Sequence, residues 1–261
     1  MSTLREHLGR ALARFLSKPS ASYRPLATSS FQDLDDNLRM GDVLLVEGNT
    51  RIAGAIKYLT QSTWSHAALC IGRGPWAGEN ALVEVDLIEG VRIVPASTYA
   101  NFHTRIARPA GLSLSEAQAI AERAVRRLGQ RYDLKNVFDL ARYLLPLPLP
   151  ASWRRRALML GSGEPTRAIC STFIAQLFES VDYPVLPQIE RRAKNESNTC
   201  YDEVLKIRHH TLYAPRDFDV SPYFAVVKPT LERGFDFHAL SWERPVAAPD
   251  VPQKRTLLST H

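Results

Sequence analysis

Three cysteines are the side chains of this 261-residue chain whose type suggests covalent chemistry: Cys70, Cys170 and Cys200. An odd and sparse set of cysteines does not make a disulfide framework, and free thiols are typical of a reducing compartment. A cysteine nucleophile must be a thiolate, which proteins favour at helix N-termini and beside imidazolium groups. The question is therefore which of the three lies in such a place.

Cys170 is the candidate nucleophile that the pattern favours. It follows the loop Gly161–Pro165, and apolar residues at helical spacing after it predict a helix that starts near residues 166–169. A thiol in the first turn of that helix gains from the helix dipole. Cys70 lies within an apolar strand, where a buried and inert thiol is expected. Cys200 lies in a polar segment without a nearby base and is interpreted as incidental.

His66 is the expected base, because it begins a strand just after the loop formed by residues 62–65 and can face a cleft there. The alternative is a purely structural histidine. His66 and Cys70 cannot be the working pair, since four residues of strand separate them by roughly 13 Å. The same distance argues against a local metal site formed by these two residues. The 104 positions between His66 and Cys170 are no obstacle, because the fold can bring the two together.

Glu84 is the expected orienting group for His66. It lies in the next predicted strand, and cross-strand side chains of antiparallel neighbours lie about 5 Å apart. A carboxylate there can hold the far nitrogen of the histidine. Asp86 shares the same face and is a competitor, and for either acid the alternative is a solvated strand face.

Short strands with short links predict an antiparallel meander that carries these residues, rather than βαβ units. The predicted strands are residues 43–46, 66–71, 81–86, 91–94, 104–107 and 224–228. Helices are predicted for residues 52–59, from the capping box Ser113-x-x-Glu116 to a stop at Gly129, for 135–145, around 170–178, and for 201–208.

The two ends of the chain differ in composition from this core. Residues 1–24 carry five basic residues against one acid, on an apolar stripe with helical spacing. This pattern fits either a helix at an anionic membrane surface, through residues 1–20, or a helix packed on the domain. Residues 19–38 are interpreted as a linker, residues 154–156 as a second basic cluster, and the chain from Pro245 as disordered. The expected organisation is an N-terminal amphipathic helix and linker over residues 1–39, a catalytic domain over 40–230, and a C-terminal extension over 231–261.

Composition excludes several classes of protein. The formal charge is +6 and the pI is about 9.3, but no basic and aromatic stripe or motif for nucleic acid is present. The sequence contains no Walker loop, dinucleotide-binding turn or zinc-ligand set, so no cofactor or metal is expected. No apolar window reaches the ~18 residues of a membrane span, and no secretory signal begins the chain. A cytoplasmic protein is expected, with peripheral membrane contact or export by another route as alternatives.

The ordered set of segments resembles the NlpC/P60 superfamily of papain-like cysteine hydrolases, in its circularly permuted YiiX/YebB-like branch. The resemblance covers roughly residues 40–228, and its pieces are specific only together and in order. They are Met40–Leu45, the strand Ser65–Gly72, Val83-Glu84 with Glu89–Val91, Gly129–Asp133, Cys170–Ile174, Ala214–Asp219 and Ser221–Phe224. The histidine strand precedes the nucleophile here, as in the permuted branch.

The resemblance implies an α+β, circularly permuted papain-like fold, with an antiparallel sheet or half-barrel packed against the nucleophile helix. It implies that Cys170 attacks a carbonyl group and becomes acylated, that His66 moves the proton, and that Glu84 rather than Asp86 orients His66. It also implies that Tyr132 lines the cleft and helps to stabilise the oxyanion, with a packing tyrosine as the alternative. Asp133 is interpreted as structural.

Three functions remain open at this point. The first is an amidase or peptidase that forms an acyl-enzyme with small peptide, amino-acid or murein-derived amides. The second is a lipid acyl hydrolase or acyltransferase at a membrane surface, since the permuted branch also resembles lecithin–retinol acyltransferase-like proteins. The third is a binding module without catalysis. The absence of a secretion signal puts a periplasmic cell-wall substrate in doubt.

Overall fold

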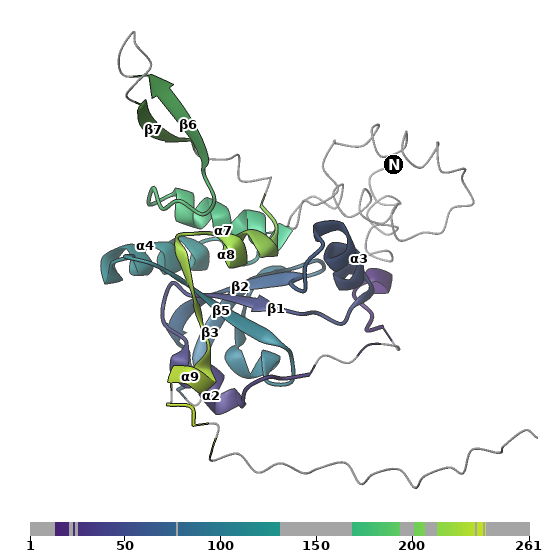
Figure 1. Ribbon diagram of the computed structural model, residues 1–261. Helices are drawn as coiled ribbons and strands as arrows, with labels where there is room; N and C mark the ends of the chain where they lie inside the picture. Colours follow the sequence, from purple (N-terminus) through teal and green to yellow (C-terminus); the bar gives the residue numbers. More distant parts are fainter. Residues whose placement is uncertain are drawn as a thin grey trace, which may run out of the picture.

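A six-stranded sheet forms the centre of the molecule, and every strand pairing in it is antiparallel. The computed structural model describes residues 14–20, 23, 26–76, 78–130, 169–193, 201–206, 213–232, 234–236 and 238. The strand order is β4-β3-β2-β1-β5-β8 (Figure 1). The strands are β1 (Val43–Val46), β2 (His66–Arg73), β3 (Asn80–Asp86), β4 (Gly90–Pro95), β5 (Thr104–Pro109) and β8 (Phe224–Val227).

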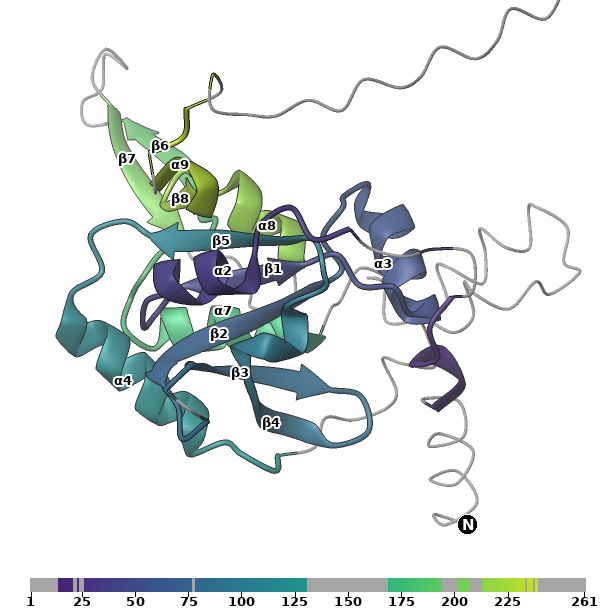
Figure 2. The same cartoon turned by 90° about the horizontal axis from the view of Figure 1, so that it is seen from below.

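Helices cover both faces of this sheet (Figures 1 and 2). One face packs against α4 (Leu114–Val125) and α7 (Ile169–Glu179), and the other against α2 (Phe31–Asn37) and the 3₁₀ helix η1 (Ala96–Tyr99). The other described helices are α3 (Arg51–Thr60), α8 (Pro215–Val220) and α9 (Pro229–Glu232). A hairpin of β6 (Gln188–Ala193) and β7 (Tyr201–Lys206) projects from the body (Figure 1).

The alternation of side chains along the strands divides the core into two clusters. Val43 and Leu45 of β1 join the cluster under α7, whereas Leu44 and Val46 join the cluster under α2. All four residues are at most 1% exposed, because successive strand side chains point to opposite faces and both faces are covered.

Most of the predicted elements are present, and the α+β class with an antiparallel sheet is confirmed. The capping box of α4 forms as expected, since Ser113 accepts from the Glu116 amide and the Glu116 side chain accepts from the Ser113 amide. The helix ends at Val125, and turns lead from there to Gly129, whose φ of 75° is the left-handed conformation that glycine favours.

Two sequence-based predictions are wrong. The proposed linker over residues 19–38 contains α2, whose cap is Ser30 and whose Leu34 is buried; the repeat of apolar residues there was too short to be recognised. Residues 201–208 were predicted as a helix, but Tyr201–Lys206 is strand β7, paired with β6. Strand pairing decides this case, because all six residues of β7 pair with β6 in an unbroken antiparallel register.

Other predictions fall on residues that the structure does not describe. These are the helix over 135–145, the basic cluster at 154–156, the first thirteen residues, and the tail after Pro245. Among the described residues, no helix is long and apolar enough to cross a membrane.

Candidate active site

Cys170 lies in the first turn of α7, as its sequence position predicted. The helix is fixed there by its neighbours: Phe173 and Ile174 are fully buried under the sheet, and Ser171 Oγ donates a hydrogen bond to the Tyr213 carbonyl at 2.7 Å. Cys170 itself is only 6% exposed. A thiol held rigidly at a helix N-terminus is in the position that favours the thiolate.

His66 is the first residue of β2, and this position lets its ring reach groups on both sides of the sheet. Its Nε2 donates to Glu84 Oε2 at 2.8 Å, and its ring also forms a hydrogen bond with the Cys170 side chain. Because Nε2 is engaged by the carboxylate, Nδ1 is the nitrogen left for the thiol. The contact joins residues 66 and 170 across a long separation in the chain.

Glu84 reaches His66 from the neighbouring strand β3. The two lie on adjacent antiparallel strands but not directly opposite each other, since the register pairs Cys70 with Leu82 and Leu69 with Val83. Glu84 is 2% exposed. Arg92 Nε donates to its Oε1 at 2.8 Å, and the Tyr99 hydroxyl donates to its Oε2.

The charges of the three groups support one another. Burial lowers the His66 pKa, but the negative Cys170 and the hydrogen bonds to Cys170 and Glu84 outweigh it and raise that pKa from 6.5 to about 10. Burial raises the Cys170 pKa, yet the charge and hydrogen bond of His66, with amides of Ala67 and Ser171, bring it below its ordinary 9.0. The arrangement therefore favours a thiolate–imidazolium pair.

The Glu84 carboxylate is ionised in this environment. Burial raises its pKa, but the hydrogen bond and charge of His66 and the hydrogen bonds of Tyr99 and Arg92 lower it from 4.5 to about 2. An ionised carboxylate can only accept, so the hydrogen on His66 lies on Nε2 in this contact.

The loop before His66 is fixed by a second polar cluster. Trp64 is 2% exposed, and its indole Nε1 donates to Asp219 Oδ2 at 3.0 Å. Arg105 donates to Asp219 Oδ1 at 2.6 Å and lies 5.0 Å from the Trp64 ring centre. These contacts tie the start of β2 to α8 and β5, so they help to hold the His66 backbone in place.

The other residues that the sequence analysis considered for the site either lie away from it or fall outside the described residues. Cys70 is buried in the core cluster on the other face of the sheet from Cys170, and burial raises its pKa to about 12, as suits an inert thiol. Asp86 caps the β3–β4 turn by accepting from the Ile88 and Glu89 amides, and it does not contact His66. Tyr132, Asp133 and Cys200 lie outside the described residues.

Sequence reasoning missed Arg92 and Tyr99, which contact Glu84. A signal existed for Arg92, because the hairpin register sets it directly opposite Glu84. No spacing rule points to Tyr99, which reaches the carboxylate from η1 only through the turn after β4.

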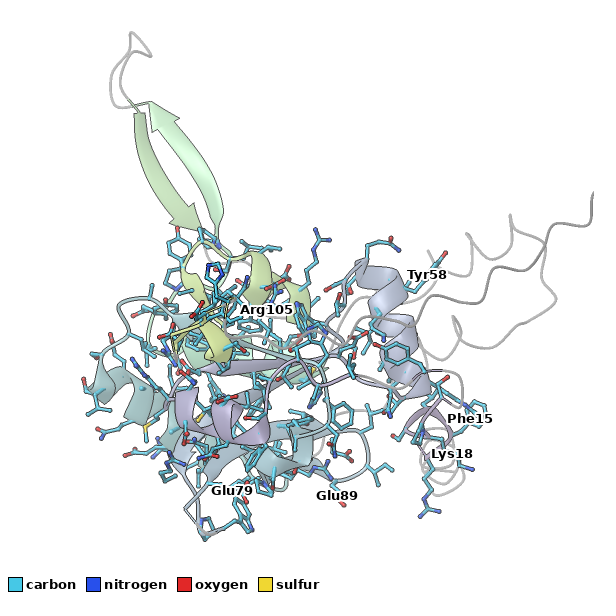
Figure 3. All side chains as sticks on the ribbon, turned by 60° about the horizontal axis from the view of Figure 1, so that its bottom comes forward. Phe15, Lys18, Tyr58, Glu79, Glu89 and Arg105 are labelled. Atoms are coloured by element: carbon cyan, nitrogen blue, oxygen red, sulfur yellow. The ribbon has the colours of Figure 1, made fainter. Side chains whose placement is uncertain are left out.

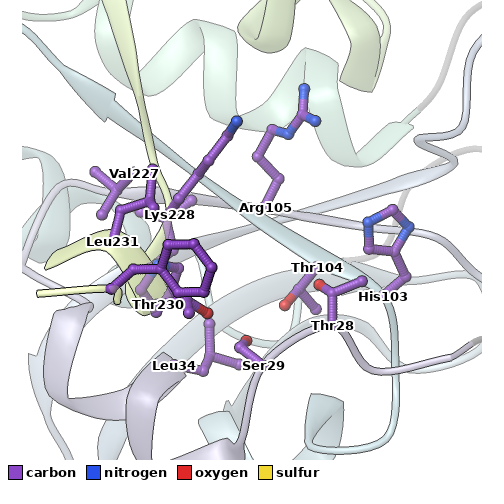
Figure 4. A pocket seen from close by; sticks show the side chains of 13 residues that line it. Thr28, Ser29, Leu34, His103, Thr104, Arg105, Val227, Lys228, Thr230 and Leu231 are labelled. Atoms are coloured by element: carbon purple, nitrogen blue, oxygen red, sulfur yellow. The ribbon is translucent and has the colours of Figure 1, made fainter. Parts of the chain in front are cut away.

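A cavity among the described residues lies away from the three residues Cys170, His66 and Glu84. It measures about 380 Å³ and is lined by residues of α2, β5, β8 and α9, with Thr104, Lys228 and Leu231 among them (Figure 4). No triad residue lines it. Within the part of the chain that the structure describes, no group of three or more His, Cys, Asp and Glu side chains could hold a metal ion.

Comparison with known proteins shows which family this chain resembles. Residues 37–143 match the model of a family described as permuted papain-like amidase enzymes, YaeF/YiiX, C92 family. This match confirms the resemblance to the permuted papain-like YiiX branch and supports a hydrolase of the amidase class. It includes His66 and Glu84 and ends before Cys170.

A solved structure is also similar to this chain. It is described as the metalloprotein YiiX from Escherichia coli O157:H7, is 16% identical, and aligns over 79% of this chain and 98% of its own with a TM-score of 0.44. No curated protein matches the chain.

Proposed function

We propose that this protein is a cysteine amidase that cleaves small amides through an acyl-enzyme, with Cys170 as nucleophile, His66 as proton carrier and Glu84 as the group that orients His66. The observation that supports this most is the continuous hydrogen-bonded chain from the Cys170 thiol through His66 to Glu84. A nucleophile, a base and a group that orients the base are the parts that covalent catalysis needs.

The steps follow from these contacts. The Cys170 sulfur attacks the carbonyl carbon, and the C–S bond forms as the negative charge moves to the carbonyl oxygen. The C–N bond then breaks, and the imidazolium of His66 gives its proton to the departing nitrogen. Water adds to the thioester and loses a proton to His66, the C–S bond breaks, and a carboxylic acid leaves.

The developing oxyanion needs hydrogen-bond donors. The first amides of a helix have no partner within the helix, so the Cys170 amide in the first turn of α7 is suitably oriented. We also assign Tyr132 to this oxyanion. Gln130, two positions before Tyr132 in the chain, is tied to β4, because its carbonyl accepts from the Val91 amide at 3.0 Å. Peptide, amino-acid and murein-derived amides are the proposed substrates.

A thiol-directed probe tests the nucleophile. We expect iodoacetamide at neutral pH to alkylate Cys170 much faster than Cys70, because Cys170 is held as a thiolate and Cys70 has a pKa of about 12. Peptide mass spectrometry measures the extent of alkylation at each cysteine.

A hydrolysis assay tests the same assignment. Cleavage of an aminoacyl-amide library is expected to disappear in Cys170→Ala and to persist in Cys70→Ala. Equal alkylation of both sites, or an active Cys170→Ala, would refute the proposal.

A lipid acyl substrate is a second candidate, supported by one surface. The N-terminal segment lies beside α3, and Arg51 of α3 lies over the Phe15 ring at 4.0 Å. Phe15 and Tyr58 are 46% and 76% exposed, and Lys18 and Arg51 are exposed as well. Lys18 lies beside Phe15, and Tyr58 lies farther along α3 (Figure 3). Aromatic rings among cations are typical of a surface that binds anionic lipid. Binding to anionic vesicles, followed by release of a fatty acid, tests this candidate.

A further inference from the structure

Both oxygens of the Glu84 carboxylate are engaged, although His66 needs only one of them. Oε1 accepts from Arg92, through Nε at 2.8 Å and Nη2 at 2.7 Å. Oε2 accepts from the Tyr99 hydroxyl as well as from His66 Nε2. A carboxylate held by charge-assisted bonds at both oxygens cannot rotate without breaking several of them at once.

The local chain builds this environment from one hairpin and the turn after it. Glu84 and Arg92 are directly opposed in the β3–β4 register, so their side chains share a face of the sheet. The chain then turns through η1, which ends at Tyr99. Tyr99 is 7% exposed and is packed against the Phe102 ring at 5.7 Å, so its hydroxyl has little freedom to leave Glu84.

His66 lowers the Glu84 pKa most, and the hydrogen bonds of Tyr99 and Arg92 lower it further, so these two partners also favour the ionised carboxylate. A carboxyl group that is 2% exposed would take up a proton in the absence of compensating groups. Tyr99 can only donate here, because burial and the nearby Glu84 charge hold its pKa well above 10.0. The charged or titratable groups around Glu84 are His66 from β2, Arg92 from β4 and Tyr99 from η1, with Cys170 behind His66, and with Asp86 and Glu89 on the outer side of Arg92.

We propose that Arg92 and Tyr99 are positioning residues, which keep Glu84 ionised and aligned with His66 and thereby sustain the Cys170 thiolate. This inference rests on the proposed function, since it concerns the same three groups. In the described part of the structure both residues donate to Glu84, and neither is hydrogen-bonded to the thiol. Their effect reaches Cys170 through Glu84 and His66 in turn.

The test is the pH profile of Cys170 alkylation by iodoacetamide in the full chain, followed by peptide mass spectrometry. In Arg92→Met the acid limb is expected to move to higher pH by about one unit, because Glu84 loses a cation and its pKa rises. Tyr99→Phe is expected to shift the limb in the same direction by less. Arg92→Lys restores the charge without the paired bonds, and we expect it to recover part of the shift.

Matched controls separate positioning from general damage. Arg108→Met removes a cation from buried Asp42, which Arg108 Nη2 contacts at 2.8 Å, and Tyr183→Phe removes a hydroxyl that donates to the Tyr223 carbonyl at 2.6 Å. Both controls are expected to change the unfolding midpoint but not the alkylation profile. Circular dichroism checks the fold, and Tyr99→Phe decides the matter if Arg92→Met does not fold.

The outcomes distinguish the two proposals. A wild-type Cys170 that titrates as an ordinary thiol near pH 9 would overturn the proposed function and this inference with it. A wild-type thiol of lowered pKa whose profile is unchanged in Arg92→Met and Tyr99→Phe would overturn the positioning role alone. A shift that the controls reproduce equally would also overturn it.

Discussion

His66 is the residue on which the proposed chemistry depends, because it contacts both Cys170 and Glu84. Its protonated form is favoured by a negative neighbour on each side, despite burial. A histidine with a free pKa near 6.5 is thereby expected to stay charged at neutral pH and to act as the acid that protonates the leaving group.

This gives a pH prediction for the reaction. Activity is expected to rise with pH as Cys170 ionises below 9.0 and to fall only as His66 loses its proton near pH 10.

The free energy of unfolding has a matching pH dependence. The contribution of the raised His66 pKa to stability is fully present below pH 6.5 and is lost as the pH rises toward 10. Profiles of kcat/KM and urea denaturation across this range check both points. An alkaline limb near pH 7 would contradict the assignment of His66.

The segment between β1 and β2 shows how an element positions a site residue. Gly48 follows β1, and its amide donates to Ser65 Oγ at 2.9 Å, one residue before His66. A Cβ on Gly48 would lie 2.9 Å from Ser65 Oγ and 2.9 Å from the Ala53 Cβ. The close approach of the two chain segments therefore requires glycine at this position.

Gly48→Ala is expected to destabilise the fold by about 1–3 kcal/mol, because the methyl group overpacks this contact. It is also expected to slow Cys170 alkylation, since a displaced Ser65 moves His66. The control is Gly54→Ala in α3, where nothing lies within 4 Å of the new Cβ. That change is expected to stabilise the protein by roughly 0.5–1 kcal/mol. Urea unfolding measures both, and equal effects of the two substitutions would contradict this account.

In the whole molecule, the exposed aromatic and basic surface and the helix α4 lie at opposite ends (Figures 1 and 2). The surface consists of Phe15, Lys18, Arg51 and Tyr58, and among the described residues neither of its two cations is recorded in an ion pair. Contact with a membrane would therefore orient the molecule with α4 away from the lipid. For such a contact, the position of these two cations on one surface matters more than the net charge of the chain.

Flotation with vesicles of phosphatidylserine and phosphatidylcholine checks this orientation. Each surface cation contributes about 1 kcal/mol to binding of anionic lipid, so Lys18→Glu with Arg51→Glu is expected to weaken partitioning tenfold or more. Arg126→Glu, at the cap that follows α4, changes an exposed cation at the other end of the molecule and is expected to have little effect. If the wild-type chain does not float with these vesicles, the lipid candidate is eliminated.

The sequence by itself determined the elements whose cause is local. Short apolar segments bounded by turn residues predicted the strands that carry His66 and Glu84, and a capping box predicted the start of α4. Cys170 was singled out because helical spacing after it is a property of a few neighbouring residues. Local pattern failed for α2 and β7, where burial and strand pairing outweigh a short or ambiguous signal.

Only the tertiary structure decided which distant groups meet. The contact of Cys170 with His66 depends on the packing of α7 against the sheet, and the bond from Tyr99 to Glu84 depends on the path of the chain through η1. The physical reason is that ionisation and orientation in a buried site depend on every group within a few ångströms, whereas a sequence pattern records only neighbours along the chain.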